Sequence, residues 1–417
     1  MNKRAKFSLF LLALGLVFEF SPARSQSTDQ TQGITRPRTV TTQGARQGTV
    51  PTQNPAVPAQ SVAQPPLSSQ LPAEMAAIQQ ARPLSMNKIS ARLAEAKRLL
   101  KSRPALTALT SPSLYTVTLA AFDDKSSQIH LISIPKEIFL KKGSELSLTT
   151  SLGASVQVRV IRANGVNTAV TVFDSTGRSF VPLIVEYPIE RGGVLNETAY
   201  YVSAHPALLS PDVVKAGQNY VRTMIDLAAK RLKDKGVPIP SNLVDIAERL
   251  CIVEHTDHTR FRNEDRKALF EEIFSLYALN ELDTYRHSVS VAGAGGMVQM
   301  IPSTYQMVRR MHPGVGLNPD FVYGMRNHGN ALEAMLLYML DTWKLLAGNS
   351  DVSGALASGV ATWPELMAAG YNSNPAKLPQ YIRRGGSGWR VLIPRETQMY
   401  LQIYRALEGA IPMKTRS

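Results

Sequence analysis

The chain has 417 residues, one cysteine and a formal net charge of +14. The single cysteine excludes an internal disulfide, and the length is sufficient for two or three domains. The positive charge indicates affinity for polyanions, which include both nucleic acids and a carboxylate-rich cell wall, and charge alone does not choose between them.

Residues 1–25 have the pattern of a secretory signal peptide. Basic residues at Lys3, Arg4 and Lys6 precede an apolar run over residues 7–18, and small residues suited to a cleavage site follow. The apolar run is short for a membrane span. We therefore expect a cleaved signal peptide and a periplasmic or secreted protein, with an uncleaved anchor as the alternative.

Residues 26–84 are rich in Gln, Thr, Pro, Ser and Ala and contain no aromatic residue. Such a segment buries too little apolar surface to offset the entropy of ordering, so we expect a flexible tether. Residues 85–110 follow as a short basic helix. We expect one apolar face of it to pack on the next domain, and surface binding to membrane or wall is the alternative. That face contains Ile89, Leu93, Ala96 and Leu100.

Residues 111–205 change to a hydrophobic period of two, which is typical of β-strands. Turn signals such as Lys142-Gly143 separate the apolar runs. Strands are predicted at residues 114–120, 128–134, 145–150, 155–161, 167–173, 179–186 and 198–203. Six or seven short strands indicate a small β-barrel or β-sandwich. Since no cluster of acidic, histidine or cysteine residues marks a site there, we expect an accessory domain with a cell-envelope protein as its candidate partner.

Residues 208–411 are predicted to be mostly α-helical, so the whole chain is a multidomain protein of the α+β class. Cys251 lies on an apolar helical stripe, which favours a small core residue over a nucleophile. Helices are predicted at residues 213–235, from Ser241, from Asn263, after Pro302, and at 331–346, 363–369 and 395–407.

The helix that begins at Asn263 carries a carboxylate at the end of its apolar stripe. Phe270, Phe274 and Tyr277 recur at helical spacing, and the next position on that face is Glu281. Burial and the negative end of the helix dipole would both favour the protonated form, which suits a general acid. The alternative is a solvated residue beyond the helix end.

A glycine-rich loop follows, and its Ser290 lies nine positions after Glu281 (290 − 281). Residues 290–304 read Ser-Val-Ala-Gly-Ala-Gly-Gly-Met-Val-Gln-Met-Ile-Pro-Ser-Thr. This run resembles the Ser-x-x-Gly-Ala-x-Gly-Leu-Met-Gln-x-x-Pro-x-Thr motif of the soluble-lytic-transglycosylase-like family, whose fold is similar to goose-type lysozyme. Residues 370–375 resemble its Ala-Tyr-Asn-Ala-Gly-Pro motif, and residues 396–400 resemble its Glu-Thr-x-x-Tyr motif. The resemblance covers the C-terminal half of the chain.

The resemblance implies an exported peptidoglycan lytic transglycosylase with a lysozyme-like C-terminal domain. In that family one glutamic acid protonates the oxygen of the MurNAc-GlcNAc bond. It then acts as base on the C6 hydroxyl of the MurNAc, and a 1,6-anhydro sugar forms. The family spacing assigns both roles to Glu281, with no cofactor and no metal. The implied substrate-binding residues are Ser290, Gly296, Met297, Gln299, Tyr371, Asn372 and Glu396.

The residues leave several alternatives open. Glu254 continues its own apolar stripe and is a second candidate for the acid, although it lies 36 positions before Ser290 (290 − 254). A non-catalytic peptidoglycan-binding scaffold on the same fold is a different function. A true hydrolase would use a second carboxylate, such as Asp283 or Glu254, to activate water. The family's serine after the catalytic glutamate is Leu282 here.

Other ligand classes are not expected. His255 and His258 lack the i, i+4 spacing of a zinc-protease helix, and the glycine run lacks the Gly-Lys-Ser/Thr ending of a nucleotide-binding loop. Glycine would instead let the loop backbone approach a sugar closely. For Gln299 the alternative to substrate contact is an amide that caps a turn. We therefore expect peptidoglycan strands as the partner and no nucleic acid.

Overall fold

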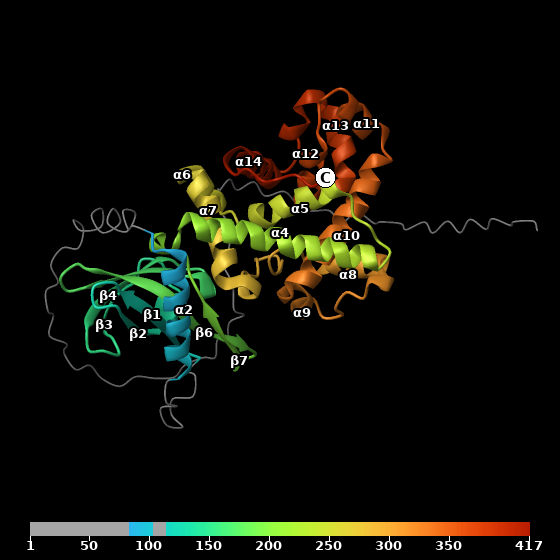
Figure 1. Ribbon diagram of the computed structural model, residues 1–417. Helices are drawn as coiled ribbons and strands as arrows, with labels where there is room; N and C mark the ends of the chain where they lie inside the picture. The colour runs from blue at the N-terminus through green and yellow to red at the C-terminus, as the bar shows by residue number, and fades with distance from the viewer. Residues whose placement is uncertain (1–82, 103–113) are drawn as a thin grey trace, which may run out of the picture. The chain divides into compact units, whose positions relative to one another are not determined.

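The computed structural model describes residues 83–102 and 114–417 (Figure 1). The predicted signal peptide, nearly all of the predicted tether and the end of the 85–110 segment lie outside these residues. The described part combines helices with one antiparallel sheet, which confirms the mixed α and β composition. Within it, no helix combines the length and the apolar character that crossing a bilayer would need.

The β-rich segment folds as a seven-stranded antiparallel sheet in the order β2-β1-β6-β5-β4-β3, with β7 paired to β6. The sheet curls so that the two ends of this strand order, β2 and β3, come together. The contact is seen in the hydrogen bond of 2.8 Å that the Ser151 amide, just after β3, donates to the Leu131 carbonyl of β2. The predicted strands are confirmed, except that β7 begins at Val194 and extends a hairpin with β6. The strands are β1 (Thr116–Asp123), β2 (Gln128–Pro135), β3 (Glu145–Thr149), β4 (Ser155–Arg162), β5 (Ala169–Asp174), β6 (Ser179–Arg191) and β7 (Val194–Tyr201).

Helix α2 (Met86–Lys101) packs on this sheet. The Ser85 side chain accepts a hydrogen bond from the Lys88 amide and caps the first turn. The helix buries Ile89, Ala96 and Leu100 in a cluster with strand residues such as Phe122. The prediction that this apolar face packs on the next domain is confirmed.

The remaining chain is helical. Its predicted helices are confirmed, with one shifted start: α7 is capped by Asp265, whose side chain accepts from the Ala268 amide, because Asn263 still belongs to α6. Short helices α6, α9, α11 and α13 were not predicted. The helices are α4 (Pro211–Asp234), α5 (Ser241–Val253), α6 (His258–Asn263), α7 (Arg266–Asn280), α8 (Pro302–Met311), α9 (Phe321–Arg326), α10 (His328–Ala347), α11 (Ser350–Ala357), α12 (Trp363–Asn372), α13 (Leu378–Gly385) and α14 (Arg395–Ala410).

Helix α5 is the most enclosed element. Every residue from Leu243 to Val253 is buried, and α4, α10, α12 and α14 all contact the helix (Figure 1). Its acidic residues are paired: the Arg416 guanidinium donates to Asp245 at 2.8 Å and to Glu248 at 2.5 Å. Cys251 is fully buried, as predicted, and burial raises the pKa of its thiol.

The sheet and the helices share one hydrophobic cluster. They are also joined by hydrogen bonds at the end of α7, where the Asn280 side chain accepts from the Val202 amide at 2.7 Å and donates to the Val202 carbonyl at 2.8 Å. A residue at the end of a helix thus pairs with the backbone just after β7. The β-rich segment is therefore an integral support of the helices that follow it.

We predict that Gly217→Ala weakens the crossing of α4 and α7. A Cβ atom at Gly217 would lie 1.8 Å from the Phe274 carbonyl oxygen. The substitution should lower the free energy of unfolding by about 2–3 kcal/mol or prevent folding. Gly354→Ala in α11 is the control, since a Cβ there meets nothing within 4 Å, and it should be neutral or stabilising. Urea unfolding followed by circular dichroism measures both, and equal stabilities would contradict the close crossing.

Candidate functional site

Glu254 lies at the C-terminal end of α5, where it is the C-cap residue. Only 5% of its surface is exposed. Its Oε1 accepts a hydrogen bond of 2.7 Å from the hydroxyl of Tyr400, which is itself buried on α14. A carboxyl group is therefore held inside the helical part of the molecule by a neutral donor from the segment over residues 396–400.

Tyr371, on α12, lies near Glu254. Its hydroxyl donates to the Val298 carbonyl at 2.7 Å. Burial, and after it the nearby charge of Glu254, raise the pKa of Tyr371 well above its usual value, so the hydroxyl keeps its proton and stays a donor. Helices α5, α12 and α14 and the glycine-rich loop thus converge near Glu254.

The glycine-rich loop is held by its own backbone. Gly295 forms bridges with Val289 and Met300, and the Gly296 amide donates to the Ser288 carbonyl at 3.0 Å. The Ser290 hydroxyl oxygen accepts from the Ala294 amide at 3.0 Å. Ser290, which the resemblance places at the sugar, therefore stabilises a turn of the loop.

Two of the loop glycines, Gly295 and Gly296, contact α9. Gly296 is buried and has a φ of 68°, and a Cβ atom there would lie 2.2 Å from the Met325 carbonyl oxygen. Any side chain at Gly296 would displace α9 or the loop. Contact with α9 is therefore a sufficient reason for this glycine, and approach of its backbone to a sugar stays a prediction.

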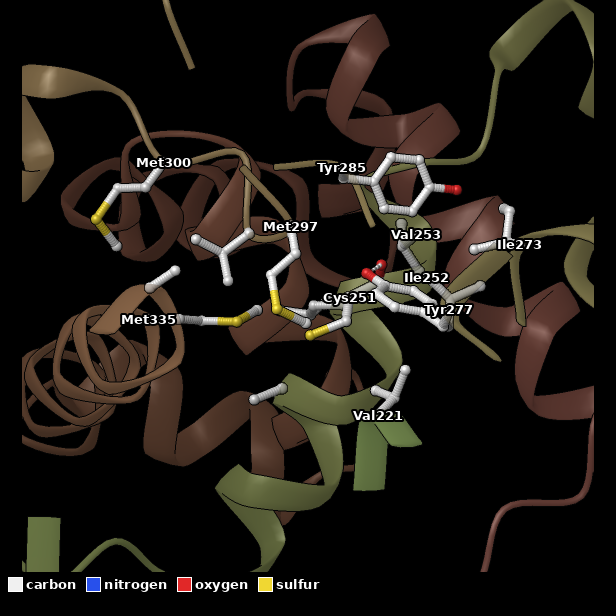
Figure 2. Packing of buried hydrophobic residues seen from close by; sticks show 14 of the residues in the cluster. Val221, Cys251, Ile252, Val253, Ile273, Tyr277, Tyr285, Met297, Met300 and Met335 are labelled. Carbon is white, nitrogen blue, oxygen red and sulfur yellow. Dashed lines mark hydrogen bonds between the residues drawn. The ribbon is translucent and has the colours of Figure 1, made fainter. Parts of the chain in front are cut away.

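Two other loop residues also face the protein. The Gln299 amide nitrogen donates to the Gly296 carbonyl at 2.8 Å and to the Ser288 hydroxyl at 3.3 Å, so it caps a turn, as the alternative stated. Met297 has no exposed surface and lies with Cys251 in the buried cluster of Figure 2. Its side chain is in the core instead of at a sugar-binding surface, because the loop folds back over α5.

His255 links the end of α5 to the loop, a contact that the sequence analysis did not identify. Its Nε2 lies 2.9 Å from the Met297 carbonyl oxygen, and its ring stacks on Tyr285 with centroids 3.4 Å apart. His255, the residue next to Glu254, is thus hydrogen-bonded to the backbone of the glycine-rich loop. Within residues 83–102 and 114–417, no group of three His, Cys, Asp or Glu side chains is placed to hold a metal ion.

The prediction that Glu281 is buried on the stripe of α7 is wrong. The helix ends at Asn280, whose side chain bonds back to Val202, and the chain turns there. Glu281 is exposed, with φ 46° and ψ −121°, an unusual conformation for a residue other than glycine. Its charge lies near Tyr220, and burial followed by that charge raises the pKa of Tyr220.

Asn372 and Glu396 have different surroundings. The Asn372 Oδ1 accepts from the Thr397 hydroxyl at 2.8 Å, which ties the segment over 370–375 to the one over 396–400. Glu396 is exposed in the first turn of α14, where a carboxylate favourably faces the positive end of the helix dipole. Asn372 therefore joins two of the three segments that resemble family motifs. Glu396 itself makes no part of this contact, which its neighbour Thr397 provides.

No family model, curated protein or solved structure matches this chain. The function proposed below therefore depends on the residues of the site and their geometry, together with the motif resemblance.

We predict that stability falls as the pH drops from 6.5 toward 4. Burial is the main cause that lowers the pKa of His205 and His328 to about 4 and of His287 to about 3. Between these values and 6.5 the unfolded chain binds protons that the folded chain does not, so each histidine reduces the free energy of unfolding by up to about 1.4 kcal/mol per pH unit.

His328→Gln tests this dependence. Urea unfolding from pH 7 to pH 4.5 should show a pH slope that is smaller by one proton than in the unchanged chain, whatever the absolute loss of stability. A slope that does not change would show that His328 is protonated in the folded protein.

Proposed function

We propose that this chain is an exported peptidoglycan lytic transglycosylase in which Glu254 is the catalytic acid and base. The observation that carries the proposal is the convergence at Glu254 of Tyr371, Tyr400 and the loop carbonyl of Val298. These residues belong to the three segments that resemble family motifs. The segments are far apart in sequence, and a shared site is a reason for all three to meet at one carboxyl group.

Glu254 is enclosed by protein and has a hydrogen-bonding partner. Its carboxyl group is buried at the C-terminal end of α5 and accepts a hydrogen bond from the Tyr400 hydroxyl. A carboxyl group whose position is defined in this way suits the geometry that a general acid and base needs. Glu281 is exposed and lacks such an enclosure, so we transfer both chemical roles from Glu281 to Glu254.

The proposed reaction uses only the substrate and this carboxyl group. Glu254 donates its proton to the glycosidic oxygen, and the bond from that oxygen to C1 of MurNAc breaks. The carboxylate then removes the proton from the C6 hydroxyl of the same MurNAc, O6 bonds to C1, and the acid is regenerated. No water is consumed, and the product is a 1,6-anhydro sugar. Tyr371 and His255 would hold the loop backbone beside the reacting groups.

A non-catalytic peptidoglycan-binding scaffold is the second candidate. It is favoured by the small exposure of Glu254 and by the internal hydrogen bonds of Ser290 and Gln299, which engage groups that a sugar would otherwise use. In the proposed enzyme a glycan strand must still reach Glu254, and groups other than the Ser290 and Gln299 side chains would bind it.

We predict that Glu254→Gln strongly slows turnover and that Glu281→Gln does not. The chain without residues 1–25 is incubated with purified sacculi, and released products are identified by mass spectrometry. Wild type and Glu281→Gln should release anhydro-muropeptides, and Glu254→Gln should be slower by about 10²–10⁴-fold, because the proton donor is gone. Circular dichroism checks that each variant is folded.

The other outcomes distinguish the alternatives. Loss of product only in Glu281→Gln would return the acid to Glu281. Products with reducing ends would indicate a hydrolase, in which a second carboxylate activates water. Absence of soluble product from every chain, with all chains still pelleting with sacculi, would reject the enzyme and support the scaffold.

A further inference from the structure

We infer that Glu197, on β7 of the sheet, is a positioning residue that fixes the glycine-rich loop of the helical part. Glu197 holds the loop whatever the protein does. The effect of Glu197 on turnover rests on the function proposed above. Glu197 belongs to the β-rich segment, in which the sequence predicts no site residue.

Glu197 binds two arginines that are distant from each other in sequence. Its Oε2 accepts from the Arg286 guanidinium at 3.2 Å, and its Oε1 accepts from the Arg326 guanidinium at 3.0 Å. The side chain is 26% exposed, so the pairs are partly shielded from solvent. Charge-assisted bonds from two guanidinium groups define the position of both arginines relative to β7.

Each arginine is close in sequence to a residue that contacts Gly296. Arg326 follows Met325, whose carbonyl oxygen lies so close to Gly296 that a Cβ there would be 2.2 Å away. Arg286 lies two positions before Ser288, whose carbonyl accepts the Gly296 amide at 3.0 Å. One carboxylate on the sheet therefore holds both segments that enclose Gly296.

The positive charges that face Glu197 come from the two arginines and not from the nearby His287. His287 has its Nδ1 3.4 Å from the Glu197 carboxylate, but burial, followed by Arg326 and Arg286, lowers the pKa of His287 to about 3. The histidine is neutral at neutral pH and adds no positive charge. Arg286 also donates to Asp283 at 3.1 Å, which steadies its guanidinium from the other side.

The loop contacts residues beside the candidate acid, Glu254. The residues directly after Gly296 are Met297, whose carbonyl is 2.9 Å from the His255 ring, and Val298, whose carbonyl accepts from Tyr371 at 2.7 Å. His255 is adjacent to Glu254 in sequence. Movement of the loop would therefore alter two contacts beside the carboxyl group.

A second junction between sheet and helices provides a matched control. Glu272 on α7 accepts two hydrogen bonds of 2.7 Å from Arg260 and one of 3.3 Å from Arg162 of β4. It resembles Glu197 in joining two arginines across sheet and helices, but its partners do not adjoin Gly296. Glu272→Gln removes a comparable charge without touching the loop.

The test is hydrogen exchange of the whole chain, with Glu197→Gln compared with Glu272→Gln and wild type. Glu197→Gln should raise amide exchange about tenfold in peptides that cover residues 288–300, since loss of such contacts typically changes coupling by a few-fold to thirtyfold. Glu272→Gln should leave exchange in that segment as in wild type. With sacculi as substrate, Glu197→Gln should lower kcat about tenfold with little change in KM, because displacement of the loop alters the Tyr371 and His255 contacts beside the carboxyl group.

Unchanged loop exchange in Glu197→Gln would overturn the inference, and so would an equal rise in both variants, which would indicate general loosening. A selective rise without any product from wild type would support the positioning of the loop and reject the proposed enzyme. A selective rise with an unchanged kcat would overturn the positioning role in catalysis. The failure of the function and the failure of the inference are therefore separate results.

Discussion

The enclosure of α5 is the constraint on which the helical part depends. A helix with every residue from Leu243 to Val253 buried needs neighbours on all sides, which α4, α10, α12 and α14 supply. Its charged groups cannot remain unpaired in such a place. Arg416 therefore reaches Asp245 and Glu248 from the end of the chain, and Tyr400 reaches Glu254. The same packing that stabilises the helix places a carboxyl group among the predicted motifs.

The glycine-rich loop is held by a different set of contacts. Backbone hydrogen bonds hold Gly295 and Gly296, the Gln299 side chain caps a turn, and α9 packs directly on the backbone of Gly296. These contacts form within the chain, without a ligand. Preorganised backbone groups beside a reacting centre contribute to catalysis because they need no rearrangement during the reaction. The internal pairing of the loop is thus compatible with the proposed enzyme and with the scaffold.

The sheet contributes more than a spacer would. Its core continues into the helices, and the Asn280 side chain joins the backbone after β7 to the end of α7. Glu197 and Glu272 each connect two arginines at this boundary. Because these contacts involve the segment before the loop, the middle of α7 and its C-terminal end, the folding of the sheet and the geometry of the candidate site are physically linked.

The sequence alone determined the strands and the longer helices. Strand and helix periods depend on residues a few positions apart, so the strands and the buried face of α2 were predicted correctly. Only the tertiary structure shows that Glu281 is exposed and that Glu254 is buried. The stripe toward Glu281 stops at Asn280, which bonds to Val202, 78 positions away. Glu254 is enclosed by Tyr400, 146 positions away. Hydrophobic spacing carries no information about contacts over such separations, since those arise only when the whole chain has packed.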